Sequence, residues 1–546
     1  MGAANFVNIA AHLPDMARRQ PDTPAIIFPR GNRRLSFREL DLLCDRIAHG
    51  LVQTGIRRGV RTVLMVTPSP EFFALTFALF KVGAVPVLVD PGLGVRNLRK
   101  CLTEAEPHAF IGIPKAHVAR LLFGWGKKSL RHLVTVGPRL FWGGTTLAAL
   151  SRHGEADLPF PLAPTEGDDT AAILFTSGST GPPKGAVYTH ANFAAQVEAL
   201  RQVYGIEPGE IDLPTFPLFA LFAPALGMTA VIPEMDFTRP GSVNPRKIIG
   251  AIERYGATTM FGSPALINRV GRFGAQHGVK LPTLKRVISA GAPVPAHVLE
   301  RFTAMLNPGV EVFTPYGATE ALPVCSMGSA EILGSTRAIT DAGGGVCVGR
   351  PVASVRLEVI EVSDEPIPVW HEGLRVPKGK IGEICVQGPQ VTKAYYSRPE
   401  ADALAKIADP ETGGFFHRMG DLGGVDESGR VWFCGRKSHR VETPEGPLYT
   451  IPCEAVFNTH PAVFRTALVG VGEKGNARPV LCVELEKGVT EKEGQVREEL
   501  LAIGRSHIHT QGIDTILFHP AFPVDIRHNA KIFREKLARW AAGKLT

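Results

Sequence analysis

The chain lacks the features that mark membrane-spanning, secreted and metal-framework proteins. No apolar run in its 546 residues approaches the roughly 18 residues needed to span a bilayer. Residues 1–20 lack the charged segment and apolar core of a secretory signal. The eight cysteines are scattered and form no CxxC pair, which argues against a zinc site or a disulfide framework. These absences favour a reducing compartment and predict a cytoplasmic protein.

Length and composition are those of an ordinary multidomain enzyme. A chain of 546 residues is too long for one hydrophobic core, so two or more domains are expected. The hydrophobic fraction is 44% and the charged fraction 21%, both usual for globular proteins. The net charge of +8 suits anionic ligands such as nucleotides. No nucleic-acid-binding motif accompanies it, so we expect no nucleic-acid partner.

Acidic residues are missing from one long stretch. Between Glu106 and Glu155 there is no aspartate or glutamate. Residues 115–142 combine basic and aromatic side chains, namely Lys115, Arg120, Lys127, Lys128, Arg131 and Arg139 with Phe123, Trp125, Phe141 and Trp142. This mixture suits a membrane surface or an acidic partner. The alternative is a solvated surface with some buried aromatic side chains.

Strand-like and helix-like segments alternate through the first 430 residues. Apolar runs such as 61–66, 84–90, 109–113, 132–137, 258–263 and 286–291 predict strands, with helices such as 70–83 between them. Past Val346 the strands become shorter and alternate in polarity, as at 354–362 and 382–388. We therefore predict an α/β fold with two mostly parallel, doubly covered sheets and a small β-rich subdomain at about 346–434. A polar break at 435–439 predicts a hinge between an N-terminal core (1–435) and a mobile α+β domain (436–546).

The decapeptide TSGSTGPPKG at 176–185 is suited to binding phosphate. It follows a strand-like run, 171–175, and precedes a helix-compatible segment, 190–203. Its glycines allow backbone amides to turn toward an anion, its hydroxyls supply neutral donors, and Lys184 adds a mobile positive charge. It is not a Walker A loop, because GxxxxGK[ST] cannot be fitted to it. The alternative is a flexible surface loop.

Five further motifs follow the decapeptide in order: SAGAPV (289–294), YGATE (316–320), MGDLG (419–423), GRKSH (435–439) and RHNAKIFREKL (527–537). Together they resemble the acyl-adenylate-forming superfamily, which contains acyl-CoA synthetases, amino-acid adenylation domains and luciferases. The resemblance covers essentially the whole chain. It implies activation of a carboxylate by ATP and Mg²⁺, with release of pyrophosphate.

The resemblance also implies roles for individual residues. The nucleotide-binding set is Thr176, Ser177, Gly178, Ser179, Thr180, Gly181, Gly291, Ala292, Tyr316, Gly317, Asp421 and Arg436. Within this set, Tyr316 would stack on adenine, and Asp421 and Arg436 would contact the ribose. The catalytic set is Lys184, Thr319, Glu320 and Lys531. Glu320 would hold Mg²⁺, an oxygen-seeking cation, and Ser438 occupies the hinge position.

An aromatic segment predicts the acyl pocket. FPLFALFAPALG (216–227) resembles the pocket segment of the superfamily, and the predicted lining is Phe216, Phe219, Ala220, Leu221, Phe222, Phe261 and Gly262. Such residues suit a fatty acyl chain; the alternative for each is plain core packing. Superfamily members often carry histidine where this chain has Ala220.

The second half of the reaction is less constrained by these motifs. Ala220 and the loop 441–454, which lacks the superfamily's glycine-rich start, put coenzyme A use in doubt. The runs GPPKGAVYTH, HRMGDLG and RHNAKIFREKL resemble the β-lactone synthetases of bacterial long-chain olefin biosynthesis. That resemblance implies a 2-alkyl-3-hydroxy fatty acid whose own hydroxyl attacks the adenylate, and an association with other olefin-pathway enzymes. The alternatives are a long-chain acyl-CoA ligase and a non-catalytic adenylate-binding protein.

Overall fold

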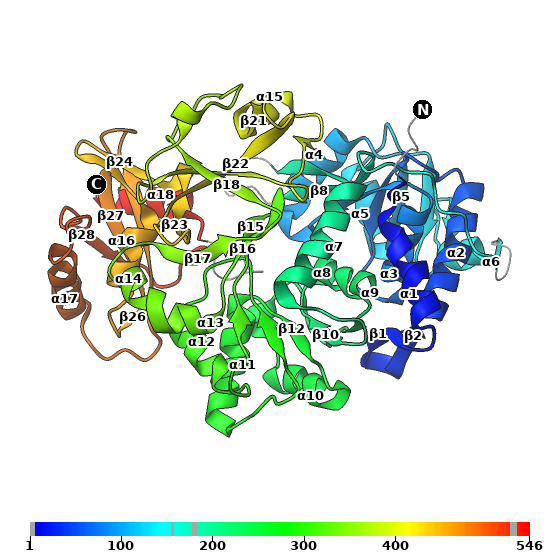
Figure 1. The fold of residues 1–546 in the computed structure, drawn as a ribbon, viewed down its shortest axis with the longest axis horizontal. Coiled ribbons are helices and arrows are strands. Elements are labelled where there is room, and N and C mark those ends of the chain that lie inside the picture. Colours follow the sequence, from blue (N-terminus) through cyan, green and yellow to red (C-terminus); the bar gives the residue numbers. More distant parts are fainter. Residues whose placement is uncertain (1–5, 154–157, 177–182, 525–531, 546) are drawn as a thin grey trace.

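The computed structural model describes residues 6–153, 158–176, 183–524 and 532–545. Figure 1 shows that the N-terminal elements and the C-terminal elements lie at opposite ends of the long axis. Three large sheets occupy the space between and around them. The fold is α/β, as the alternating strand and helix patterns predict.

The first sheet carries the decapeptide. Its order is β20-β9-β8-β4-β3-β5-β6-β7. Its strands are β3 (Arg61–Met65), β4 (Val85–Val89), β5 (Ala109–Gly112), β6 (His132–Thr135), β7 (Thr145–Thr146), β8 (Thr170–Thr176), β9 (Lys184–Thr189) and β20 (Ala394–Tyr395). The strands from β8 to β7 pair in parallel, while β9 and β20 pair antiparallel at one edge.

The second sheet has the order β14-β13-β12-β10-β11-β1-β2. Its strands are β1 (Pro24–Phe28), β2 (Arg33–Ser36), β10 (Ile211–Pro214), β11 (Thr229–Val231), β12 (Thr259–Phe261), β13 (Arg286–Ile288) and β14 (Val312–Phe313). All its pairs are parallel except β1 with β2. This strand direction agrees with the prediction of mostly parallel sheets, because helices connect the strands.

The helices of this region lie between and around the two sheets. They are α1 (His12–Arg19), α2 (Phe37–Gln53), α3 (Pro70–Lys81), α4 (Gly94–Ala105), α5 (Pro114–Phe123), α6 (Leu147–His153), α7 (His190–Tyr204), α8 (Pro217–Ala220), α9 (Phe222–Leu226), α10 (Pro245–Tyr255), α11 (Pro264–His277) and α12 (Ala296–Thr303). Many begin as their sequences require. Ser36 caps α2 through a reciprocal bond with Glu39, and Ser69 caps α3 ahead of Pro70.

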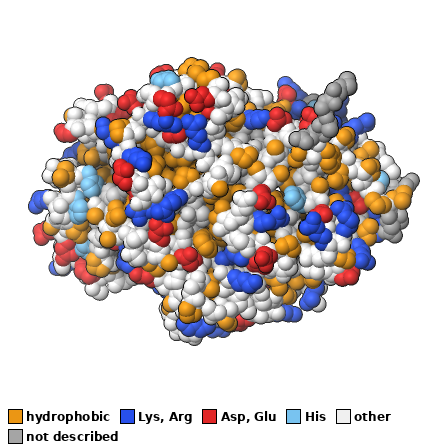
Figure 2. Space-filling model, in the orientation of Figure 1, with side chains coloured by type: hydrophobic (Ala, Val, Ile, Leu, Met, Phe, Trp, Pro, Cys, Tyr) orange, Lys and Arg blue, Asp and Glu red, His pale blue; other side chains and the backbone are white. Residues whose placement is uncertain are grey.

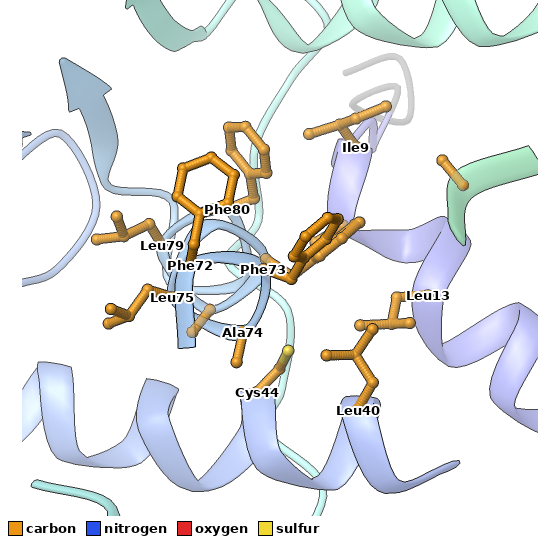
Figure 3. Close-up of a cluster of buried hydrophobic side chains, with 14 of the residues drawn as sticks. Ile9, Leu13, Leu40, Cys44, Phe72, Phe73, Ala74, Leu75, Leu79 and Phe80 are labelled. Carbon is orange, nitrogen blue, oxygen red and sulfur yellow. The ribbon is translucent and has the colours of Figure 1, made fainter. Parts of the chain in front are cut away.

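Helix α3 is the centre of the largest hydrophobic core. Every residue from Phe72 to Lys81 is buried, so the helix is apolar on all sides rather than along one stripe. Figure 3 shows the labelled side chains of α3 pointing in all directions, with Leu40 and Cys44 of α2 on one side and Leu13 of α1 on another. A helix with this pattern must be enclosed by other elements, and α3 therefore fixes the packing of the N-terminal region.

The third sheet is antiparallel throughout and has the order β15-β16-β17-β23-β22-β19-β18, with β21 paired to β22. Its strands are β15 (Tyr316–Ala318), β16 (Ala321–Ser326), β17 (Val346–Pro351), β18 (Arg356–Ile360), β19 (Gly382–Gln387), β21 (Lys406–Asp409), β22 (Gly414–Val425) and β23 (Val431–Arg436). Helices α13 (Ser329–Glu331), α14 (Arg337–Asp341) and α15 (Pro399–Ala405) connect them.

The sheet therefore begins at Tyr316, about 30 residues before the predicted subdomain boundary near Val346. The sequence predicts only nucleotide and Mg²⁺ contacts for the YGATE motif. In the structure the motif also forms strand β15 and turns directly into β16. The pairing of β16 with β17 joins this hairpin to the rest of the sheet. Composition changes at Val346 because α13 and α14 separate the hairpin from the later strands.

The C-terminal region is a compact α+β unit after a one-turn helix, η7 (Lys437–His439). It contains β24 (Val441–Thr443), β25 (Gly446–Leu448), α16 (Thr450–Phe457), β26 (Val463–Val471), β27 (Arg478–Leu485), α17 (Glu493–Arg505), β28 (Thr515–Phe518) and α18 (Arg534–Leu545). Its own hydrophobic clusters lie on β26, β27 and the helices packed against them. The boundary at 435/436 and the mobility of this unit stay predictions.

Charges of both signs are interspersed on the face of the molecule seen in Figure 2. Lysine and arginine side chains alternate there with aspartate and glutamate rather than forming one basic field. Within the described ranges, no helix is both long and apolar enough to cross a membrane.

Candidate active site

One large cavity of about 1140 Å³ brings the predicted motifs together. Its lining has a polar part, which includes Lys184, Thr319, Glu320 and Arg436, and an apolar part rich in phenylalanine. The polar residues come from β9, the β15–β16 turn and the end of β23. The cavity therefore combines charged groups suited to a nucleotide with apolar walls suited to an acyl chain.

Tyr316, Asp421 and Arg436 form a connected group beside the polar part. The Tyr316 hydroxyl donates to Oδ2 of Asp421 at 2.8 Å, and Arg436 Nη1 lies 2.9 Å from Oδ1 of Asp421. Strands β22 and β23 hold Asp421 opposite Arg436 in register. Burial raises the pKa of Asp421, which the neighbouring guanidinium opposes, and Asp421 in turn raises the pKa of Arg436.

Arg436 lines the cavity, whereas Tyr316 and Asp421, predicted to contact the nucleotide, are not part of its wall. Oδ1 of Asp421 is buried and lacks a well-aligned hydrogen bond among the described residues, although Arg436 lies close to it. A buried carboxylate oxygen with no aligned donor is costly unless a ligand supplies one. A pair of vicinal hydroxyls would supply such donors. Oδ1 of Asp421 could therefore accept a hydrogen bond from a ribose hydroxyl, which is compatible with the predicted ribose contact.

Glu320 lies on the cavity wall beside two residues of the first sheet. The hydroxyl of Tyr395 donates to its Oε1 at 2.8 Å, and among the described residues no donor contacts Oε2. The Lys184 ammonium lies 4.9 Å from the centroid of the Tyr395 ring. A carboxylate oxygen facing a cavity fits Mg²⁺, which is commonly held by one or two carboxylates together with substrate phosphates.

Sequence reasoning missed the buried groups behind Glu320. Burial lowers the pKa of Lys406 to about 7, and its ammonium donates to the carbonyl of Thr392. His417 lines the cavity and is only 2% exposed, and burial keeps its pKa well below the ordinary value, an effect that Lys406 reinforces. Lys406 and His417 lie on β21 and β22 at paired positions. Only the pairing of these two strands shows that the two side chains are neighbours.

The phosphate-loop prediction falls largely outside the described residues. Ser177, Gly178, Ser179, Thr180 and Gly181 lie outside them, and so does Lys531. The strands on either side are described: β8 ends at Thr176 opposite Lys184 at the start of β9. The decapeptide therefore connects two antiparallel strands, whereas in a Walker A loop a helix follows directly.

Two glycines of the predicted nucleotide set line the cavity where a side chain could not fit. Gly291 has a φ of +101°, which side chains strongly disfavour. A Cβ on Gly317 would lie 2.6 Å from the carbonyl oxygen of Ala321. Both residues line the cavity, whereas Ala292 is not part of its wall. At Gly317 the absence of a side chain therefore permits the tight turn between β15 and β16, and at Gly291 it permits the positive φ at the cavity wall.

The apolar part contains most of the predicted acyl pocket. Phe219 packs edge-on against Phe216, with ring centroids 5.1 Å apart, and against Phe261 at 4.5 Å. Phe216, Phe219, Leu221, Phe222 and Phe261 all line the cavity. Aromatic edges of this kind give a firm apolar wall.

Two predicted pocket residues do not line the cavity. Ala220 is fully buried in the main core, because the short helix α8 turns it away from the phenylalanines. Gly262 follows the end of β12, and its amide donates to the carbonyl of Ile288 at 2.9 Å. A side chain there would meet Leu266 and Ile267 at 3.1 Å, so this position serves packing rather than the cavity.

Much of the apolar wall comes from helices that sequence reasoning did not assign to a pocket. The contributions of α3 and α5 include Phe72, Phe77, Phe80, Ala116 and Ala119. The phenylalanines of α3 were visible in the sequence as an unusually apolar helix. Nothing in the sequence distinguishes the ones that face the cavity from those that face the core.

The predicted hinge lies on the cavity wall, where Lys437 and Ser438 both contribute. Lys437 is anchored on the N-terminal side, with its ammonium 3.0 Å from Oε1 of Glu383. Glu383 is also paired with Arg418 at 2.6 Å, and both side chains are almost fully buried. Ser438 follows this anchor directly, so a rotation there would leave the contacts of Glu383 with Lys437 and Arg418 intact. It would separate Arg440 and Lys474, which pair with Asp364 at 2.9 and 2.6 Å, from that carboxylate.

Comparison with known proteins agrees with the class that the fold and the cavity indicate. The model of a family described as AMP-binding enzyme matches residues 13–396, and the chain belongs to this family. It is 54% identical to the olefin beta-lactone synthetase of Stenotrophomonas maltophilia over 98% of each chain. It is also 26% identical to a long-chain-fatty-acid–CoA ligase of Escherichia coli O6:H1, over 96% of this chain and 93% of the relative.

Solved structures share the fold across the whole chain. The amide bond synthetase McbA from Marinactinospora thermotolerans superposes with a TM-score of 0.82 at 22% identity, covering 98% of this chain and 99% of that one. The anthranilate CoA ligase AuaEII in complex with anthranoyl-AMP gives a TM-score of 0.81 at 20% identity, covering 100% of this chain and 98% of that one. At this identity the likeness establishes the architecture.

Proposed function

We propose that this protein uses ATP and Mg²⁺ to adenylate a long-chain 2-alkyl-3-hydroxy fatty acid and then closes a β-lactone, releasing AMP and pyrophosphate. The observation that carries the proposal is the likeness over nearly the full length to an olefin beta-lactone synthetase, 54% identical over 98% of both chains. The joined polar and apolar cavity of about 1140 Å³ supports it, because both a nucleotide and a long acyl chain must be accommodated.

In the first step a carboxylate oxygen attacks the α-phosphate and pyrophosphate leaves. Negative charge then crowds the phosphates, so catalysis depends mainly on positioning and on charge stabilisation. Lys184 and the proposed Lys531 would supply positive charge, and Thr319 would donate to the α-phosphate. Asp421 and Arg436 would hold the ribose, while Tyr316 would flank the adenine. Mg²⁺, held on Glu320, would neutralise phosphate charge when bound.

In the second step the hydroxyl oxygen of the same acyl group attacks the acyl carbon. A carbon–oxygen bond closes the four-membered ring, the bond from the acyl carbon to the AMP oxygen breaks, and the hydroxyl proton leaves to solvent or to a basic group. An internal nucleophile has a high effective concentration, although ring strain opposes closure. No thiol is required, which is consistent with the loop 441–454 after the hinge, because it lacks the superfamily's glycine-rich start.

The test is product formation from a synthetic 2-alkyl-3-hydroxy acid with ATP and Mg²⁺, with and without coenzyme A. AMP formation and a β-lactone detected by NMR without coenzyme A would support the proposal. A thioester that forms only with coenzyme A would favour the second candidate, an acyl-CoA ligase, which the Escherichia coli relative makes reasonable. Absence of ATP–pyrophosphate exchange with any acid would favour a non-catalytic nucleotide-binding protein.

A further inference from the structure

The outer face of α5 and the loop after β6 expose large apolar side chains. Leu122 is 74% exposed and Phe141 is 81% exposed. The group, here named the α5 patch, consists of Val118, Leu121, Leu122, Phe123, Leu140 and Phe141, all of them exposed. Isolated exposed apolar residues are common, but a cluster of this kind points to an interaction surface.

Ring contacts fix the two halves of the α5 patch beside each other. His117 of α5 stacks on Trp142, with ring centroids 5.2 Å apart and an interplanar angle of 3°. Trp142 is further held by its indole nitrogen, which donates to Thr135 at 2.9 Å. Phe141 precedes this buried anchor and packs against it at 5.5 Å. The exposed loop that carries Leu140 and Phe141 is therefore held against α5.

The opposite face of α5 forms part of the cavity wall. Ala116 and Ala119 line the cavity together with Trp125, which follows the helix. Trp125 is buried, and the ring of Phe123 lies 5.8 Å from it. Helix α5, roughly 10 Å across, thus separates Val118 and Leu121 from the apolar part of the cavity. Phe123, one turn after Ala119, lies at the edge between the two.

The chain segment that carries the α5 patch has charged side chains of one sign. No aspartate or glutamate occurs between Glu106 and Glu155. Lys127, Lys128, Arg131 and Arg139 are all exposed in the segments that adjoin the patch. Exposed Arg96, Arg99 and Lys100 lie on α4, which also contributes Leu98 to the cavity wall.

We propose that the α5 patch docks on an anionic lipid bilayer, with Leu122 and Phe141 entering the interface and the flanking cations contacting lipid phosphates. Apolar side chains surrounded by lysine and arginine are the pattern of interfacial membrane binding. The positive sign of the segment between Glu106 and Glu155 suits a continuous anionic surface, whereas a folded protein partner usually presents charges of both signs. The purpose of docking, access to a lipid substrate beside the cavity, rests on the proposed function.

The experiment is co-sedimentation of the full chain with vesicles, in the absence of ATP and acid. One set is phosphatidylcholine alone and the other is phosphatidylcholine mixed with phosphatidylglycerol. We expect binding to the anionic vesicles only, and weaker binding at high salt. Lys127→Ser with Lys128→Ser should weaken binding about fivefold for each charge removed. Leu122→Ser with Phe141→Ser should weaken it on the order of tenfold or more.

Ile508→Ser is the matched control, because Ile508 is 88% exposed but lies far along the chain in the C-terminal region. It should bind vesicles like the wild type. Failure of the wild type to bind anionic vesicles would overturn the proposal, as would equal binding by the Leu122→Ser and Phe141→Ser double variant. Two further results would overturn the proposal. One is self-association of the wild type that this double variant abolishes, and the other is binding of an acidic protein by the wild type without binding to vesicles.

Vesicle binding is independent of the chemistry, so this result and the result for the proposed function can be told apart. Both double variants should retain wild-type ATP–pyrophosphate exchange when the acid is dispersed in detergent. Loss of exchange in them would indicate damage to the cavity wall rather than loss of docking.

Discussion

Beside the polar part of the cavity, Tyr316, Asp421 and Arg436 are joined by contacts of 2.8 and 2.9 Å. In the apolar part, Phe219 meets Phe216 and Phe261 through edge-to-face contacts, with ring centroids 5.1 and 4.5 Å apart. Directed bonds need one residue type at one place, whereas apolar packing tolerates substitutions of similar volume. Changes in the polar part should therefore act on the chemical step, and changes in the apolar part on the choice of acid.

The largest effect is expected from Lys531→Ala. Removing a cation that stabilises transition-state charge should lower kcat for adenylation by about 10²–10³, with little change in KM for the acid. ATP–pyrophosphate exchange measures it. Lys544→Ala, an exposed lysine in α18, is the control and should stay within twofold of the wild type. A similar loss in both variants would remove Lys531 from the catalytic set.

The next effect is expected from Asp421→Asn. The substitution removes the charge that pairs with Arg436 and a hydrogen-bond acceptor for ribose. A hydrogen bond to a charged group contributes about 1.5–3 kcal/mol, so kcat/KM for ATP should fall about 10- to 100-fold. Tyr316→Phe removes only the donor to Oδ2 and should cost several-fold. Equal losses in the two variants would contradict a direct ribose contact by Asp421.

An intermediate effect, confined to long acids, is expected from Ala119→Phe. The added ring would fill the cavity beside α5, so kcat/KM for a long-chain acid should fall about tenfold while a short-chain acid is adenylated normally. The measurement is the rate of AMP formation as a function of the chain length of the acid. Val118→Phe on the exposed side of the same helix is the control. An equal fall for all chain lengths would mean that α5 does not bound the acyl site.

The smallest effect concerns stability around Lys406. Burial lowers its pKa from 10.5 to about 7, so between these values the unfolded chain binds more protons than the folded one. Wild-type stability therefore gains up to about 1.4 kcal/mol per pH unit as pH rises from 7 toward 10.5. Lys406→Met lacks this gain. The melting temperature of Lys406→Met, measured relative to the wild type, should therefore fall as the pH rises from 7 to 10. Lys487→Met, at an exposed position, should show no such trend.

The motif residues of the polar part could be predicted because the chemistry requires them in short, ordered runs. YGATE contributes the Tyr316 hydroxyl, the glycine that approaches Ala321 and the Glu320 carboxylate within five residues. Ala220 and Gly262, two of the predicted pocket residues, do not line the cavity, because neighbours along the chain can face opposite sides of a short helix or strand end. Lys406 and His417 were missed because only strand pairing brings them beside Glu320.

By itself the sequence determined the fold class and the family, and it gave the residues that we predict for phosphate, ribose and Mg²⁺. These follow from local order: strand and helix periodicity, and polar groups at a fixed spacing along one segment. Only the tertiary structure decided which apolar side chains face the cavity, that YGATE begins the third sheet, and that one face of α5 lines the cavity while the other is exposed. Those facts depend on contacts between segments far apart in the chain, because apolar side chains attract without direction and carry no local signature of their partner.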